Sequence, residues 1–274
     1  IHTSRLDAMV HVDDPLAEVP DTPPTDVEIS IGRAIAEHIP DGAVLQVGVG
    51  AIPNAVLHAL KDHRHLGVHT EALTDGMREL IETGVVDNSL KQVEPGRTVA
   101  SLALGTRSLY DFIDHNPVIL MRDIAWVNDP FVIAQNHNMA AINSCLEIDL
   151  SGQVCADSIG TRIYSGVGGQ QDFVYGSSRS VGGQSFIAMP ATTTHGATKI
   201  KPVLTPGAGV VTTRFQTNWV VTEYGAVNLR GRNMIDRARL LISIAAPEFR
   251  EELDRAAFDM LGYAYRRWHA VAEP

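Results

Sequence analysis

Apolar side chains follow two alternating periods along the first third of the chain. Over residues 27–36 they recur at helical spacing, which predicts an amphipathic helix. The short, mostly apolar segments 43–47 and 66–69 predict two buried strands. Helical spacing returns after each of them, so the predicted order is strand, helix, strand, helix, with short turns in between.

Turn and capping residues mark the ends of these two helices. Pro53 fits the first turn of the helix after the first strand, because its missing N–H would have no partner there. Asp75 is a candidate N-cap for the helix after the second strand, and Gly84 is expected to end that helix. Two successive strand–helix units predict a parallel sheet with right-handed crossovers.

The rest of the chain continues this alternation. Further strands are predicted in the apolar segments 98–104, 117–121, 140–150, 186–189, 209–213 and 219–222. Residues 152–183 are rich in glycine and serine, which predicts hairpins and functional loops. Helices are predicted over residues 237–244 and from Pro247 onward. The predicted fold class is α/β, a mostly parallel doubly wound sheet flanked by helices, with additional hairpins.

Prolines and acidic residues crowd an early segment, residues 15–26. Each proline fixes φ and removes a backbone donor, so this segment is predicted to be an extended linker. The residues before it are too few to fold alone. We therefore expect residues 1–25 to form a linker and residues 26–274 to form the folded domain. The chain also begins at Ile1 instead of methionine, which is typical of a fragment or a processed chain.

Composition narrows the function classes. The 274 residues are 45% hydrophobic and 20% charged, which supplies a large core and excludes intrinsic disorder. A net charge of −10 argues against nucleic acid and anionic membrane surfaces as partners, although a local site can still bind a small anion. No apolar run approaches the roughly 20 residues of a membrane span. Two cysteines cannot build a disulfide framework, so we expect a cytoplasmic protein.

A glycine-rich turn follows the first predicted strand. Gly48, Val49 and Gly50 lie between that strand and its helix, where exposed N–H groups and the helix dipole can hold an anion. Glu71 comes just after the second predicted strand, and ligands of such sheets bind beyond the carboxyl ends of the strands. The turn and Glu71 are therefore candidate neighbours in one site. The alternatives are a turn without a ligand and a solvated glutamate.

The same residues also fit a dinucleotide site. Such sites use the pattern G-x-G-x-x-G and an acidic residue about 20 positions later that binds a ribose hydroxyl. Glu71 has nearly that spacing from Gly50, but Pro53 stands where the third glycine is needed for close helix packing. The dinucleotide hypothesis is weakened by this difference and stays open.

Further candidate chemistry lies in the middle of the chain. Residues 166–173, followed by Gly182 and Gly183, can present N–H groups as an oxyanion hole or cradle a chain-like ligand, or they can simply form two hairpin turns. Glu147 and Asp149 share one strand face, which is more typical of solvated acids than of a catalytic pair. The 11 histidines show no metal-ligand spacing, so no metal site is predicted.

Several of these segments resemble the acetyl-CoA hydrolase/transferase family. They occur in the order that the family has, between residues 27 and 260. The segments are residues 48–57, 69–76, 141–143, 146–153, 166–173, 221–225 and 229–231. The chain most resembles the branch that contains 4-hydroxybutyrate, butyrate and acetate coenzyme A-transferases.

The resemblance implies a site and a reaction. Glu71 would be the catalytic glutamate, Gly169 a backbone donor near the thioester, and Leu146 a coenzyme contact. The implied coenzyme loop consists of Gly48, Val49, Gly50, Ala51 and Ile52. The implied reaction moves coenzyme A between an acyl-CoA and a short-chain carboxylate through a covalent glutamyl-CoA thioester. The alternatives are an acyl-CoA hydrolase, and a nucleotide- or CoA-binding module without catalysis.

The resemblance also implies domains and partners. Members of the family have two related α/β domains, and this chain looks like the second, preceded by the inter-domain connection at residues 1–25. An amino-terminal domain is therefore expected in addition to residues 26–274. Coenzyme A and acyl-CoA are the implied substrates, with no prosthetic group and no metal. We expect a homodimer without nucleic acid or membrane partners.

Overall fold

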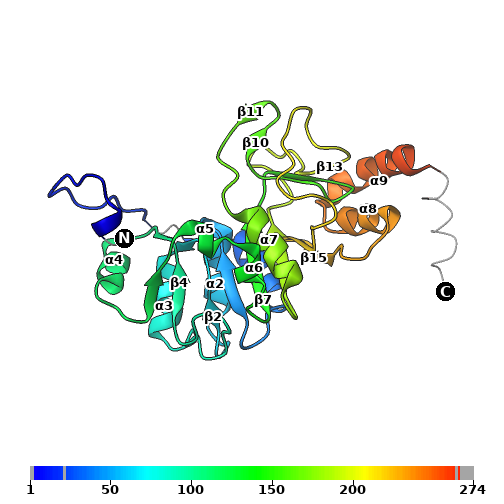
Figure 1. Cartoon of the computed structure of the whole chain (residues 1–274). Helices are drawn as coiled ribbons and strands as arrows, with labels where there is room; N and C mark the ends of the chain where they lie inside the picture. Colours follow the sequence, from blue (N-terminus) through cyan, green and yellow to red (C-terminus); the bar gives the residue numbers. More distant parts are fainter. Residues whose placement is uncertain (1–2, 21–22, 263–264, 266–274) are drawn as a thin grey trace.

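A computed structural model of the chain describes residues 3–20, 23–262 and 265. Its centre is a six-stranded sheet in the order β15-β14-β12-β7-β1-β2, flanked by helices (Figure 1). Neighbouring strands are parallel except β14 and β15. The strands are β1 (Val44–Val47), β2 (Gly67–Val68), β7 (Met139–Ser144), β12 (Gln184–Ala188), β14 (Trp219–Thr222) and β15 (Gly225–Asn228). The predicted α/β class with a mostly parallel sheet is confirmed.

The order of the strands reverses between β1 and β7. β2 lies on one side of β1. Beyond β2, a bridge between His69 and Val99 leads to the pair β4 (Thr98–Ala100) and β6 (Ile119–Met121). The chain returns on the other side of β1 as β7 and continues outward to β12 and β14. In sheets of this kind, ligands bind beyond the carboxyl ends of the strands at the reversal.

Helices cover both faces of this sheet. Leu45 and Ile142 point into the core beneath α1, α2 and α3, whereas Val44 and Ala141 point into the core beneath α5, α6 and α7. Both faces are therefore buried, which explains why the strands are mostly apolar. The helices are α1 (Asp26–Ala36), α2 (Ala51–Ala59), α3 (Asp75–Glu82), α5 (Ile124–Val127), α6 (Pro130–Ile133) and α7 (Gln170–Arg179).

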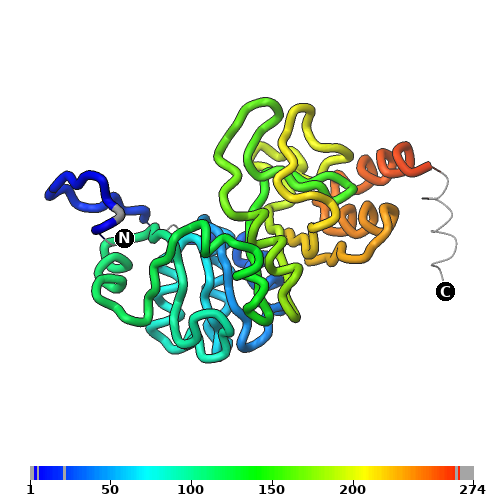
Figure 2. Tube along the Cα trace, viewed as in Figure 1, coloured from blue at the N-terminus to red at the C-terminus, as the bar shows by residue number. Residues whose placement is uncertain are grey.

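A second apolar core lies beside the sheet, at the upper right of Figure 1. There the three-stranded sheet β13-β8-β9 and the helices α8 and α9 enclose Ile148, Leu150 and Val154. The loop that contains β10 and β11 stands beside the loop that follows β13, above this core in Figure 2. The two loops are joined where the Gly209 N–H donates to Ser158 Oγ at 2.8 Å. The elements are β8 (Glu147–Asp149), β9 (Val154–Cys155), β10 (Ser158–Ile159), β11 (Arg162–Ile163), β13 (Ile200–Lys201), α8 (Met234–Ser243) and α9 (Pro247–Leu261).

The described part of residues 6–25 contains no helix or strand and is exposed. It contacts the folded body where the Val19 N–H donates to the Gly105 carbonyl at 3.0 Å. A capping box between Thr25 and Glu28 then starts α1. The remaining described elements are η1 (Thr3–Arg5), β3 (Ala72–Leu73), β5 (Leu102–Ala103) and α4 (Arg107–Ile113). None of the helices that the structure describes is long and apolar enough to cross a membrane.

Three local predictions were wrong. For residues 166–173 the alternative of two hairpin turns was wrong, because α7 begins at Gln170 and buries Phe173, Val174 and Ser177 at helical spacing. The hairpin predicted within residues 152–183 is present, since β10 and β11 pair as antiparallel strands. Residues 209–213 form no strand, since only Thr212 bridges to β9. Asp75 is the first residue of α3 rather than its N-cap, because its carboxylate accepts the N–H and hydroxyl of Thr106, each at 2.8 Å.

The contact between α1 and α2 depends on Gly32. A Cβ at this position would lie 2.7 Å from both the carbonyl carbon and the carbonyl oxygen of Ala55. We predict that Gly32→Ala forces the two helices apart and lowers the free energy of unfolding by about 1–3 kcal/mol in urea denaturation. Gly166→Ala is the control, because nothing lies within 4 Å of a Cβ there. Equal losses in the two variants would refute this explanation.

Candidate active site

Glu71 lies in the bend between β2 and β3, just past the carboxyl end of β2. Its backbone carbonyl accepts hydrogen bonds from the N–H groups of Ser101 and Leu102, both at 3.0 Å. These bonds hold the backbone of Glu71 against the segment that follows β4. The side chain is half-buried, so its carboxylate is partly shielded from water.

Two residues from distant parts of the chain contact the Glu71 carboxylate. Asn128 Nδ2 donates to Glu71 Oε2 at 2.9 Å. A Cβ added to Gly169 would overlap both Glu71 Oε2 and Asn128 Nδ2. Position 169 therefore admits only glycine while the other two side chains keep their places. Oε1 of Glu71 accepts no hydrogen bond from the described residues, which leaves it available to attack a carbonyl carbon.

A buried histidine supports the segment that carries Asn128. Since the Val127 carbonyl can only accept, His69 Nε2 carries the proton of the 2.8 Å bond between them. Burial lowers the pKa of His69 to about 4, so the ring is neutral at pH 7. Its ring packs near Trp126 and Phe173. His69 thus joins the end of β2, which leads to Glu71, to α5, which leads to Asn128.

A second carboxylate, that of Asp172, lies in the first turn of α7 beside this cluster. Burial and the charge of Glu71 raise the pKa of Asp172 above its ordinary value. The amino end of α7 favours negative charge, whereas the two carboxylates repel each other. Conversion of Glu71 into an uncharged acyl derivative would remove that repulsion.

The glycine-rich turn lies at the end of the neighbouring strand. β1 and β2 pair with Leu45 opposite Val68, so Gly48 and Glu71 each follow that pair by three residues. The Gly48 N–H donates to the carbonyl of Ile142 in β7, at 2.9 Å. Gly50 is the N-cap of α2 and has a φ of +133°, which favours glycine. The turn therefore sits where the strand order reverses.

This turn lines a cavity of about 330 Å³. Val49, Gly50 and Ala51 lie on one side of it, and Thr74 and Gly76, at the start of α3, lie on another. The amino ends of α2 and α3 therefore border the same space, and both carry partial positive charge. Glu71 is not among the residues that line this cavity.

The other residues singled out in the sequence make contacts that do not involve Glu71. Ile52 is buried in the core beneath α2. Leu146 follows β7 at the same sheet edge, but its N–H donates to the Cys155 carbonyl at 2.9 Å, which ties it to the smaller sheet. Glu147 accepts the N–H and hydroxyl of Thr205, and Asp149 accepts bonds within its own turn, so both acids have structural contacts.

Asn128 and Asp172 were not identified as site residues from the sequence. Asn128 is separated from Glu71 by 57 positions, and its only local signal is a break between two short helices. Asp172 belongs to the glycine-rich segment 166–173, but its approach to Glu71 depends on the helix that was missed. In the part of the chain that the structure describes, no group of three or more His, Cys, Asp or Glu residues could hold a metal ion.

Comparison with known proteins places this chain in a family. Residues 105–257 match the acetyl-CoA hydrolase/transferase C-terminal domain. The chain is 51% identical over 264 residues to a succinyl-CoA:acetate/propanoyl-CoA:succinate CoA transferase of Fasciola hepatica, and the aligned region covers 95% of this chain and 55% of that protein. It is 47% identical over 254 residues to a 4-hydroxybutyrate coenzyme A transferase of Clostridium kluyveri, covering 92% of this chain and 59% of that protein.

A solved structure agrees with these similarities. RipA of Yersinia pestis matches with a TM-score of 0.90 and 44% identity, over 95% of this chain and 59% of that one. The chain therefore spans less than two thirds of the length of these relatives. The resemblance found in the sequence motifs is confirmed, and the chain belongs to the family of acetyl-CoA hydrolase/transferase C-terminal domains.

Proposed function

We propose that this chain carries the catalytic glutamate of a coenzyme A-transferase, and that Glu71 is that residue. The observation that carries the proposal is the contact of the Glu71 carboxylate with Asn128 and Gly169 at the amino end of α7. The names of the similar CoA transferases support the same reaction class. The substrates would be an acyl-CoA and a short-chain carboxylic acid.

The proposed reaction exchanges one thioester for another of similar energy, so neither ATP nor a prosthetic group is required. Glu71 Oε1 attacks the acyl thioester carbonyl, the C–S bond breaks, and a mixed anhydride and the coenzyme thiolate form. The thiolate then attacks the Glu71 carboxyl carbon, which releases the first carboxylate and leaves a glutamyl thioester. A second carboxylate reverses these steps and leaves as the new acyl-CoA.

The geometry around Glu71 suits this nucleophile. A carboxylate is a weak nucleophile in water, so it must be oriented and partly dried. Asn128 holds Oε2 at 2.9 Å, while Gly169 lets the start of α7 approach closely. The N–H groups at the start of that helix are candidate donors for the tetrahedral oxyanion. Asp172 lies beside this site, where burial and the charge of Glu71 raise the pKa of Asp172.

The proposed coenzyme loop is the turn from Gly48 to Ile52. It is supported by the cavity that Val49, Gly50 and Ala51 line at the strand end next to Glu71. Ile52 would contribute by anchoring the turn in the core, since its side chain is buried. Leu146 stays a proposed coenzyme contact, supported by its place at the same sheet edge.

The relation to the rest of a longer protein is also proposed. Residues 1–25 would connect an amino-terminal domain to the domain formed by residues 26–274. This is supported by the coverage of 55% and 59% of two relatives. The homodimer and the cytoplasmic location stay predictions.

We predict that Glu71→Ala lowers acyl-CoA:carboxylate transfer by about 10⁴-fold or more, because the nucleophile is removed. Coenzyme A should still bind in calorimetry. In the parent chain incubated with an acyl-CoA, hydroxylamine should trap the glutamyl thioester, and mass spectrometry should find the trapped product on Glu71. Glu252→Ala, at an exposed site on α9, should behave like the parent. Undiminished transfer by Glu71→Ala would contradict the assignment of Glu71 as the nucleophile. Release of free coenzyme A by the parent chain without an acceptor acid would indicate hydrolysis instead of transfer.

We predict that Asn128→Ala lowers kcat by about 10²-fold with a smaller change in KM, because Glu71 is no longer held in its attacking position. Asn116→Ala is the control, since that amide bonds only to Phe112 and Val118 nearby. Steady-state kinetics on both variants decide the question. A parent-like kcat for Asn128→Ala would mean that the bond to Glu71 has no catalytic role.

We predict that Gly48→Ala weakens coenzyme A binding by about tenfold without lowering Tm. A Cβ there would lie 3.5 Å from the Ile142 carbonyl oxygen and 3.6 Å from Asn143 Oδ1, which are ordinary contacts. The fold therefore tolerates the methyl group, whereas a coenzyme lying against the turn would not. Calorimetric titration together with thermal unfolding tests this, and an unchanged affinity would remove the turn from the coenzyme site.

A further inference from the structure

Two buried amide side chains, which we call the amide pair, face each other at the carboxyl ends of β1 and β7. They are Gln46, which is 4% exposed, and Asn143, which is 7% exposed. Asn143 Nδ2 donates to Gln46 Oε1 at 2.9 Å, and Gln46 Nε2 donates to Asn143 Oδ1 at 3.2 Å. All other residues of these two strands are apolar except Ser144, which is exposed. The amide pair is therefore one closed polar contact in an apolar pair of strands.

The amide pair lies on the face of the sheet against which α7 packs. Because side chains two apart on a strand share a face, Gln46 points the same way as Val44. For the same reason, Asn143 points the same way as Ala141. Both apolar residues belong to the core beneath α5, α6 and α7. The amino end of α7 on this face reaches Glu71, so the amide pair and the proposed nucleophile share one side of the sheet.

The strand register places Asn143 level with Glu71. Leu45 stands opposite Val68 on one side and opposite Ala140 on the other. Glu71 and Asn143 each follow that level by three residues. The residue of β1 that lies between them is the first glycine of the glycine-rich turn, which has no side chain to separate them.

The amide pair is also in direct contact with the glycine-rich turn. A Cβ at Gly48 would lie 3.6 Å from Asn143 Oδ1, so the Asn143 side chain lies against the first residue of the turn. The Gly48 N–H is bonded to the carbonyl of Ile142, the residue before Asn143. Gln46 stands two residues before Gly48 on β1. Both ends of the amide pair are thus linked to the place where the chain leaves β1.

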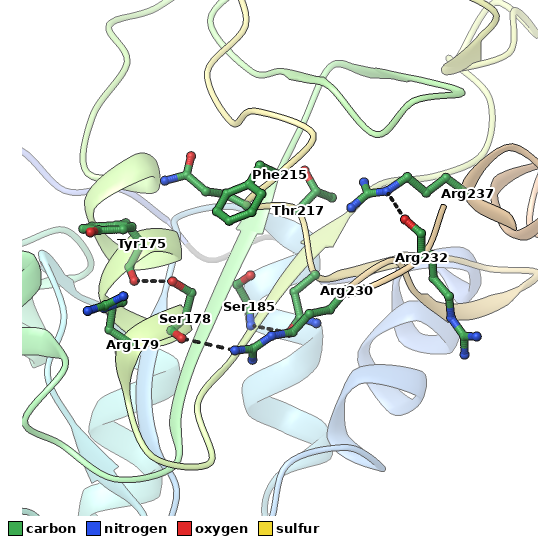
Figure 3. A pocket seen from close by; sticks show the side chains of 12 residues that line it. Tyr175, Ser178, Arg179, Ser185, Phe215, Thr217, Arg230, Arg232 and Arg237 are labelled. Carbon is green, nitrogen blue, oxygen red and sulfur yellow. Dashed lines mark hydrogen bonds between the residues drawn. The ribbon is translucent and has the colours of Figure 1, made fainter. Parts of the chain in front are cut away.

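The amide pair belongs to this edge of the sheet alone. On the next strand, β12, Ile187 stands opposite Asn143 and is fully buried. Ser185, two residues earlier, lines a cavity of about 500 Å³ at the carboxyl end of α7 (Figure 3). Neither Gln46 nor Asn143 lines that cavity. The polar contacts at the level of Glu71 therefore end at Asn143.

A buried amide pair suits positioning better than stabilisation. Its net contribution to stability is small, because each amide exchanges bonds with water for bonds with its partner, and apolar side chains of similar shape can replace both at little cost. Its geometry is demanding, however. The two bonds of 2.9 and 3.2 Å are made only in one register of β1 against β7 and in one orientation of each amide.

We propose that Gln46 and Asn143 are positioning residues for the coenzyme turn, and that their mutual hydrogen bonds hold Gly48 level with Glu71. The inference rests on the proposed function, since it takes residues 48–52 as the coenzyme turn. A thioester lying across a turn that is fixed in this way meets the Glu71 carboxylate at a constant height. The amide pair acts through the turn and needs no contact with the substrate.

The first test replaces both amides by apolar side chains, Gln46→Met together with Asn143→Leu. This double variant should keep the parent Tm, because no buried polar group is left unpaired. It should bind coenzyme A about tenfold more weakly in calorimetry, and kcat should fall by about tenfold as well. Amide hydrogen exchange at residues 48–52 should become faster. A contact with a purely structural role would leave affinity, kcat and exchange unchanged.

The matched control is Asn136→Leu. Asn136 is another fully buried amide, and its Oδ1 accepts the Val93 N–H at 3.2 Å in front of β7, at the other end of the strand. Its loss should lower Tm, because the Val93 N–H loses its partner. Coenzyme affinity and hydrogen exchange at residues 48–52 should stay as in the parent.

An exchanged pair provides a second test that keeps both amides. Gln46→Asn and Asn143→Gln should each weaken coenzyme A binding by about tenfold, and the two substitutions together should restore it, because the pair can form again. Additive losses in the exchanged pair would overturn the proposal. So would parent-like affinity and exchange in the apolar double variant, or an equal loss of affinity in Asn136→Leu.

The outcome is separable from that of the proposed chemistry. Calorimetry and hydrogen exchange need no turnover, so both can be repeated in the Glu71→Ala background. The same tenfold difference should appear there between the intact amide pair and the apolar double variant. Absence of transfer in the parent chain, with this difference preserved, would reject the proposed reaction and leave the positioning role intact.

Discussion

The site depends on one contact, the approach of the Glu71 carboxylate to Asn128 and Gly169. Three separate segments meet there, and the absence of a Cβ at position 169 is what allows them to meet. Each segment is held from behind. Ser101 and Leu102 bind the backbone of Glu71, and His69 binds the carbonyl next to Asn128. A carboxylate held in this way is already oriented, as the proposed attack on a thioester requires.

Helix α7 extends from the surroundings of Glu71 to a cavity at the opposite edge of the sheet. Its amino end brings Gly169 and Asp172 to Glu71, and its carboxyl end brings Arg179 to this cavity, which Arg230, Arg232 and Arg237 also line. The helix dipole favours negative charge at the first end, where two carboxylates already repel each other. The chain is acidic as a whole, yet it gathers unpaired positive charge at the far edge of the sheet. Local placement of charge, rather than net charge, decides where an anion can bind.

Much of the fold could be predicted from local patterns. The strands β1 and β2 and the helices α1 to α3 follow from apolar periodicity, because both faces of the sheet are covered and most of the buried positions are apolar. The helix α7 could not be recognised in the same way. Its buried face includes Gly176 and Ser177, which do not distinguish a helix from a loop. Residues 209–213 had a strand-like pattern, but only one bridge pairs them with β9.

The sequence by itself determined the α/β class, the position of Glu71 after the second strand, and the motifs that indicate the family, because these features are local or occur in a fixed order. Only the tertiary structure decided which groups touch the carboxylate. Asn128 is 57 positions from Glu71, and the arginines that line the cavity at the carboxyl end of α7 are spread from position 179 to 237. Such groups are brought together by packing of distant elements, and no pattern along the chain records that packing.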